Sequence, residues 1–173
     1  MRSKVVVGNW KLNGSLAANE ALLRALLAEI PRQSPVACAV CVPSRAQLMT
    51  GLTLWHAHAN FIAKPEDTRF ERRPYRAFPA ELRKAGWQTF ATGKWHNGPK
   101  LFNECFADGG NIFFGGMTDQ NHAPVHPYDP GGRYPKESSR TLHEFSSAAF
   151  ATTAMDFLRR RDRAKPFLLY VAF

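Results

Sequence analysis

The sequence has no long apolar run and few cysteines. No stretch of about 18 consecutive apolar residues occurs, which argues against a membrane-spanning helix. Three cysteines in 173 residues are too few for a disulfide framework and fit a reducing compartment. Residues 1–14 contain only a short valine run, which is too short for the apolar region of a signal peptide. From the sequence as written we expect a cytoplasmic protein with no membrane partner.

Acidic residues are also scarce. The chain has 14 Asp and Glu against 23 Lys and Arg, a formal net charge of +9. This excess indicates an anionic partner: nucleic acid, an acidic polysaccharide, or a small phosphate or sulfate ester. The largest basic cluster, residues 159–163 (RRRDR), closes a predicted helix, where cations suit the negative end of the dipole. We interpret the cluster as a solvated helix end and expect no nucleic-acid partner.

Apolar residues are plentiful enough for one globular α/β domain. They make up 45% of the chain, and its length excludes a complete (β/α)₈ barrel of roughly 200–400 residues. Strands predicted at residues 5–7 and 36–42 flank a helix that runs from Ser15 to Ile30. This βαβ unit predicts a mostly parallel sheet flanked by helices. Further helices are predicted over 44–50, 78–85 and around 150–158. Strands are predicted over 87–92 and 167–173, and the second of these is expected to be fully buried. Residues 52–78 are expected to be irregular, and a long loop-rich region is expected after residue 92.

Cys41 lies where a predicted strand leads into a helix. Its side chain would face unpaired amide donors and the positive end of the helix dipole, with Arg45 one turn away on the same face. Such surroundings lower the pKa of a thiol and can hold an oxyanion. Cys38 and Cys41 could instead form a redox or zinc C-x-x-C pair, but no second Cys or His pair has zinc spacing. A buried structural thiol is the other alternative, and the one we favour for Cys38 and Cys105.

Residues 41–51 (CVPSRAQLMTG) match the Cys-x-Pro-Ser-Arg-x-x-x-x-Thr-Gly signature of formylglycine-dependent sulfatases position for position. Residues 93–98 (GKWHNG) resemble a second motif of that family, and Lys94 and His96, two apart on an extended segment, can address one site. The resemblance runs from about residue 39 to the C-terminus. It implies an alkaline phosphatase-like but truncated fold, with Cys41 oxidised to formylglycine as nucleophile and calcium ligand. Arg45 would steady it, Lys94 would hold the sulfate, and His96 would contact the formylglycine hydroxyl.

The resemblance also implies partners: a sulfated small molecule or polysaccharide, and a formylglycine-generating or sulfatase-maturing enzyme. Members of the family are often exported. Calcium is expected from the family, but few ligands for it are present. The paired aspartates that end the first strand of the family are missing here, and no Asp precedes Asp67. A hard dication needs six to eight oxygen ligands.

The first residues resemble another family. Residues 7–15 (VGNWKLNGS) are similar to the opening of triosephosphate isomerase, in which the residues matching Asn9 and Lys11 contact substrate, and this likeness continues to about residue 43. We therefore expect a chimera: an isomerase-like βαβ segment at 1–40 and a partial sulfatase domain at 41–173. The remaining chain has no room for the rest of an isomerase.

Two further expectations concern the rest of the chain. Asp119, His122 and His126 could suggest a metal site, but we interpret them, like the histidines at 56, 58 and 143, as surface or substrate-cleft residues. The function predicted is sulfuric ester hydrolysis, impaired in this chain. The alternatives are an isomerase-derived fragment, or a non-catalytic α/β fragment that self-associates through an exposed strand edge.

Overall fold

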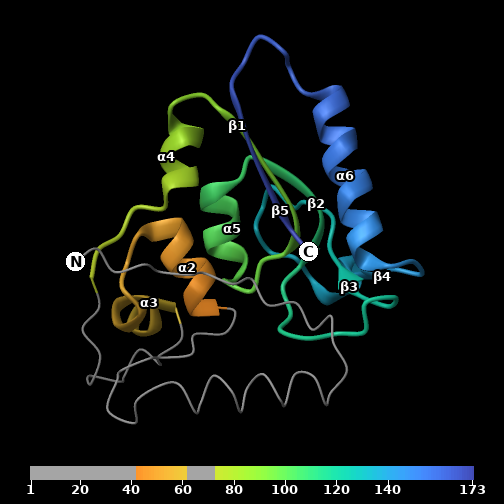
Figure 1. Ribbon diagram of the computed structural model, residues 1–173, viewed down its shortest axis with the longest axis horizontal. Coiled ribbons are helices and arrows are strands. Elements are labelled where there is room, and N and C mark those ends of the chain that lie inside the picture. The colour runs from red at the N-terminus through yellow and green to blue at the C-terminus, as the bar shows by residue number, and fades with distance from the viewer. Residues whose placement is uncertain (1–41, 62–72) are drawn as a thin grey trace, which may run out of the picture. The chain divides into compact units, whose positions relative to one another are not determined.

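The computed structural model describes residues 42–61 and 73–173, which all lie in a compact unit bounded by Ala39 and Phe173. The predicted strand at 5–7, the helix at 15–30, all but the last residue of the predicted strand at 36–42, and the proposed join near residue 40 lie outside the described residues. Figure 1 shows the arrangement of the elements.

A three-stranded parallel sheet forms the centre of this unit. Its strand order is β2-β1-β5, with β1 (Gln88–Lys94) between β2 (Asp108–Phe113) and β5 (Phe167–Ala172). A short antiparallel pair, β3 (Pro124–Val125) with β4 (Arg140–Thr141), lies beside β2 through a bridge between Ile112 and His126. Because the three main strands are parallel, their carboxyl ends share one edge, where α/β proteins build their sites.

Helices cover both faces of the sheet. The helix α6 (Ser146–Arg160) packs on all three strands, while α4 (Phe78–Lys84) contacts β1 and α5 (Pro99–Cys105) from the other side (Figure 1). The first two described helices, α2 (Val42–Thr50) and α3 (Leu54–Phe61), pack on each other. A 3₁₀ turn spans Lys136–Ser138. The predicted α/β class with a mostly parallel sheet is confirmed.

Alternation along β1 explains why this strand is central. Phe90 stacks on Phe157 of α6 with ring centroids 4.5 Å apart, and the next residue, Ala91, joins the aromatic cluster on the opposite face. Successive side chains on a strand point to opposite faces, so a strand covered on both sides needs apolar residues throughout. The central five residues of β1 are buried, and the two that are polar, Thr89 and Thr92, are small.

Several predicted boundaries are wrong. Val42 begins a helix and does not end a strand, and residues 54–61, expected to be irregular, form α3. The region after residue 92, expected to be loop-rich, contains α5 and a core strand, β2, which includes Gly109 and Gly110. β5 is half-buried for most of its length and not fully buried, because among the described residues only β1 pairs with it.

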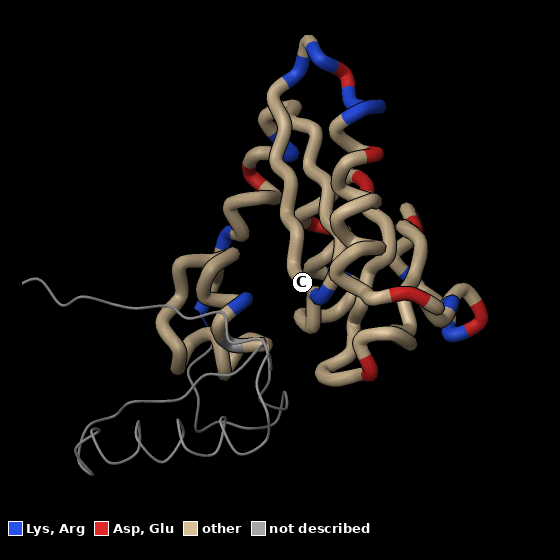
Figure 2. Tube along the Cα trace, turned by 45° about the vertical axis from the view of Figure 1, so that its right-hand side comes forward, with Lys and Arg blue, Asp and Glu red and all other residues tan. Residues whose placement is uncertain are grey.

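The basic cluster lies at the exposed end of α6, as predicted. Arg159 pairs with Asp156 at 3.0 Å and Arg160 with Asp108 at 2.6 Å, and more than half of each arginine side chain is exposed. Figure 2 shows the cluster at the tip that joins α6 to β5. Among the described helices, none has both the length and the apolar character needed to cross a bilayer.

Candidate active site at the carboxyl end of β1

The central strand delivers Lys94 to the shared carboxyl edge of the sheet. Lys94 is the last residue of β1, and its ammonium Nζ donates a hydrogen bond to the backbone oxygen of Gly116, in the segment that follows β2. The strand reaches this point through Gly93, which has φ +90° and where an added Cβ would lie 2.0 Å from the Ala172 carbonyl oxygen. Only glycine fits so close to β5, so the backbone geometry explains why a glycine directly precedes Lys94.

His96 meets the same glycine from the other side. An added Cβ on Gly116 would lie 3.0 Å from His96 Cε1, so the imidazole rests against this residue. Lys94 and His96 thus both contact Gly116. That the two address one site stays a prediction, and the reason given for it, an extended segment, is wrong. His96 has φ +59°, a left-handed conformation, so the segment is not extended. The turn, and not a two-residue alternation, brings the imidazole back towards Gly116.

Arg45 reaches the site from α2. Its Nη1 donates a hydrogen bond to the phenol oxygen of Tyr170, on β5, across 125 positions of sequence. Tyr170 lies opposite Ala91 of β1, the strand that ends at Lys94, so the α2 arginine reaches the strand next to the one that carries Lys94. The resemblance implies that Arg45 steadies the group formed from Cys41, which lies outside the described residues, and it does not identify Tyr170.

The site is electrostatically positive. The pKa of His96 is lowered from its ordinary value first by burial and then by the positive charges of Lys94 and Arg45. Both cations therefore lie within electrostatic range of the imidazole, which stays neutral at pH 7. A neutral imidazole offers one donor and one acceptor nitrogen next to two permanent cations. This combination suits the binding of an oxyanion at which a bond is broken or formed.

Trp95 anchors the segment between Lys94 and His96. Its side chain is 1% exposed, and its Nε1 donates to the Gly98 carbonyl oxygen at 2.9 Å. Its ring makes near-perpendicular contacts with Phe102, Phe106 and Tyr170, with centroids 5.4–5.9 Å apart. The flanking Lys94 and His96 are thus fixed from inside the core.

Several predicted site residues lie outside the described residues. These are Cys41, the candidate nucleophile, and Asn9 and Lys11 of the isomerase-like segment. Cys41 directly precedes the first residue of α2, the helix that carries Arg45. Cys105 is confirmed as a buried thiol: it is 0% exposed, and burial, with the charge of Glu104, raises its pKa to about 12.

The histidines outside this site make local contacts. His122 and Asp119 are exposed and pair at 2.9 Å, and the rings of His122 and His143 meet with centroids 6.0 Å apart. His126 is half-buried and lies 3.1 Å from the Ser138 hydroxyl. Within residues 42–61 and 73–173, no three His, Cys, Asp or Glu side chains gather as a metal site would require.

Calcium does not fit the described part of the candidate site. Arg45 and Lys94 are donors only, and His96 supplies nitrogen, whereas calcium takes oxygen ligands, several of them carboxylates. The family-based expectation of calcium therefore has no support from these side chains.

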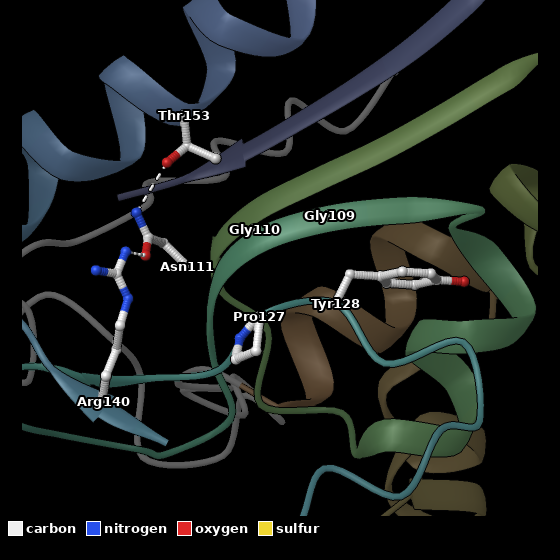
Figure 3. A pocket seen from close by; sticks show the side chains of 7 residues that line it. All are labelled: Gly109, Gly110, Asn111, Pro127, Tyr128, Arg140 and Thr153. Atoms are coloured by element: carbon white, nitrogen blue, oxygen red, sulfur yellow. Dashed lines mark hydrogen bonds between the residues drawn. The ribbon is translucent and has the colours of Figure 1, made fainter. Parts of the chain in front are cut away.

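Apart from the candidate site, a hollow of about 230 Å³ lies along β2. It is lined by glycines 109 and 110, Asn111, Pro127, Tyr128, Arg140 and Thr153, as Figure 3 shows. Asn111 bridges its two sides: its Nδ2 donates to Thr153 Oγ1 at 2.8 Å, and its Oδ1 accepts from Arg140 at 2.7 Å (Figure 3). None of the residues predicted for the site lines this hollow.

The family follows from comparison with known proteins. The model of the family described as Sulfatase matches residues 1–173. The chain belongs to the sulfatase family. Its likeness to human N-acetylgalactosamine-6-sulfatase is 29% identity over 154 residues, which cover 77% of this chain and 30% of that protein.

The sulfatase chain is also similar to triosephosphate isomerases over its first part. It is 50% identical over 44 residues to the Delftia acidovorans enzyme, 25% of this chain and 18% of that protein. It is 51% identical over 70 residues to the Azoarcus sp. enzyme, 38% of this chain and 27% of that one. The chimera-like resemblance is thus confirmed, while the boundary near residue 40 stays a prediction. The chain spans less than a third of each of these relatives.

Proposed function

We propose that this chain carries the sulfate-binding part of a sulfatase active site, formed by Arg45, Lys94 and His96, and that Cys41 becomes the formylglycine nucleophile. The observation that carries the proposal is the meeting of Lys94 and His96 at Gly116, with Arg45 held by Tyr170 on the neighbouring strand and within electrostatic range of His96. The family supports the reaction class: a sulfuric ester and water yield an alcohol and sulfate.

The cations provide for a sulfate group. An ammonium has three N–H donors, so the bond from Lys94 to Gly116 leaves two for sulfate oxygens. Arg45 uses one of its five donors on Tyr170. Hydrogen bonds from charged donors to an oxyanion are the strong ones, and fixed donors need little reorganisation. His96, held neutral, can carry a proton to or from the reacting oxygen. Formylglycine would supply the nucleophilic hydroxyl.

The partners proposed follow from this chemistry. The substrate is a sulfated small molecule or polysaccharide, and the name of the human relative makes a 6-sulfated N-acetylgalactosamine the first compound to test. Conversion of Cys41 needs a formylglycine-generating or sulfatase-maturing enzyme. We expect turnover by this chain to be small, because it spans only part of its sulfatase relative.

Mass spectrometry tests the nucleophile. The chain is co-expressed with a formylglycine-generating enzyme, and the tryptic peptide that carries residue 41 is measured. The proposal predicts the mass of formylglycine in the wild type and in a Cys38→Ser control, and none in Cys41→Ser. An unmodified thiol at Cys41 would contradict the nucleophile assignment.

A non-catalytic alternative rests on β5. Among the described residues this strand pairs only with β1, and its residues Phe167–Val171 are half-buried. An edge with unpaired backbone groups can accept a strand from a second copy. We propose such self-association as the second candidate. It predicts a concentration-dependent dimer in sedimentation, whereas a monomer with slow amide exchange at both edges of β5 would contradict it.

An isomerase-derived activity is the remaining alternative, with Asn9 and Lys11 as substrate contacts. Its support is the isomerase likeness, which covers 25% of this chain in the Delftia acidovorans comparison. A coupled assay with glyceraldehyde 3-phosphate decides it. We expect no turnover, because the barrel needs roughly 200–400 residues.

A further inference from the structure

Arg45 is held by a neutral acceptor. Its Nη1 donates to the phenol oxygen of Tyr170, and no carboxylate pairs with it among residues 42–61 and 73–173. An ion pair would orient a guanidinium but also cancel part of its field. A phenol orients the guanidinium and leaves its full positive charge for an anion, because the phenol is uncharged below pH about 10.

The phenol oxygen of Tyr170 is itself fixed in place. The Tyr170 ring stacks on Phe106 at 28° and meets Trp95 edge-on at 89°, both with centroids 5.9 Å away. Phe106 and Trp95 are 0% and 1% exposed. The backbone of Tyr170 is paired with Ala91 in the parallel ladder of β5 and β1. A ring packed from two sides on a paired strand holds its hydroxyl at one point.

The same tryptophan links this hydroxyl to the other site residues. Trp95 lies between Lys94 and His96 in the sequence and contacts the Tyr170 ring in space. Trp95 therefore fixes Lys94 and His96 through the backbone that joins them. Through its contact with the Tyr170 ring it also helps to fix the phenol that binds Arg45. Charged groups that must meet one small anion lose much of their effect when one of them is misplaced.

We propose that Tyr170 is a positioning residue that holds the Arg45 guanidinium at the anion site through its hydroxyl. The inference rests on the proposed function for its purpose, but the contact can be tested without it. It predicts that removing one oxygen atom, with the ring left in place, frees Arg45 and weakens binding of a sulfate group.

The test compares Tyr170→Phe with Tyr128→Phe. The Tyr128 hydroxyl is also hydrogen-bonded, but as a donor to the Phe106 carbonyl oxygen at 3.2 Å, and it lies outside the anion site. The first readout is the ¹H–¹⁵N spectrum of the arginine guanidinium groups, with the Arg45 signals assigned from Arg45→Met. We expect distinct Nη signals in the wild type and in Tyr128→Phe, and averaged signals in Tyr170→Phe. Distinct Arg45 signals in Tyr170→Phe would overturn the proposal.

The second readout is the affinity for inorganic sulfate by calorimetry. We expect Tyr170→Phe to bind about tenfold more weakly than Tyr128→Phe, the size of one lost hydrogen bond to a charged group. If Tyr170→Phe loses the Arg45 signature while the wild type binds no sulfate, the positioning contact stands and the proposed function fails. Equal affinity and unchanged Arg45 signals in Tyr170→Phe would overturn the positioning role alone.

A third measurement tests the contact without Tyr170→Phe, in case that variant does not fold. 3-Fluorotyrosine is placed at position 170 of the otherwise unchanged chain, and its ¹⁹F shift is compared in the presence of Arg45 and of Arg45→Met. We expect the shift to move, because the guanidinium is bonded to the labelled phenol. An identical shift in both chains would overturn the proposal.

Discussion

Gly116 is the residue whose substitution separates the two halves of the site. Gly116→Ala leaves the backbone oxygen that accepts from Lys94, but it places a Cβ 3.0 Å from His96 Cε1 and 3.4 Å from Nε2. A carbon pair prefers a separation of about 3.5–4.0 Å. The imidazole must therefore move away by a few tenths of an ångström, while Lys94 keeps its acceptor.

The size of the effect follows from that displacement. A misplacement of about 1 Å can cost about a hundredfold in a preorganised site, so a shift of a few tenths should weaken sulfate binding about two- to fivefold. Stability should change by less than about 1 kcal/mol, because one flexible side chain yields. The ring should also shift its ¹H–¹³C signals.

Calorimetry with inorganic sulfate and an NMR titration of His96 measure both consequences. Gly131→Ala is the matched control, because the atoms nearest its Cβ would be those of Asp129 and Arg133, which are not residues of the site. If Gly116→Ala, like Gly131→Ala, leaves both the sulfate affinity and the His96 signals unchanged, the contact between His96 and Gly116 on which the site is built is refuted.

Three further predictions concern charge, pH and the core. Lys94→Met should raise the pKa of His96 towards its ordinary value, since one of the charges that lower it is gone, and NMR titration measures this. The pKa values of His96 and His126 are both lowered by burial, so protonation favours the unfolded chain. Stability should be complete above pH about 6.5 and fall as pH drops through the folded pKa values, less steeply in a His126→Gln variant. Phe157→Ala should lower the free energy of unfolding by about 3–5 kcal/mol in urea denaturation, whereas Met155→Ala, 51% exposed on the same helix, should change it by less than about 0.5 kcal/mol.

Local patterns were sufficient to predict the elements with strong periodicity. The helix around 150–158 and the strand that begins near residue 87 both form, because their apolar residues recur at one period. β2 could not be predicted in this way, since Gly109 and Gly110 are typical of turns. Its residues pair with β1, and an added Cβ on Gly109 would lie 2.8 Å from the Ala91 carbonyl oxygen. Tertiary closeness, and not propensity, explains the glycine there.

The site was predictable as a set of residue types but not as a set of contacts. Lys94 and His96 are identified from one motif, yet the left-handed turn at His96 that joins them at Gly116 cannot be read from it. Only a few per cent of non-glycine residues adopt φ > 0, and His, although enriched among them, is usually found elsewhere. Tyr170 was missed for a different reason. Its partner, Arg45, lies 125 positions away on α2, and only the tertiary packing of that helix brings the two together.

The affinity for inorganic sulfate tests the central claim most directly, because it needs neither formylglycine nor the remainder of a sulfatase. The account predicts that the wild-type chain binds sulfate and that Lys94→Met and Arg45→Met each weaken binding about tenfold or more. Lys165→Met, which removes an equal charge from an exposed ion pair with Asp162, should leave the affinity unchanged. Equal losses in all three variants would show that net charge alone attracts sulfate and would contradict a site built from Arg45, Lys94 and His96.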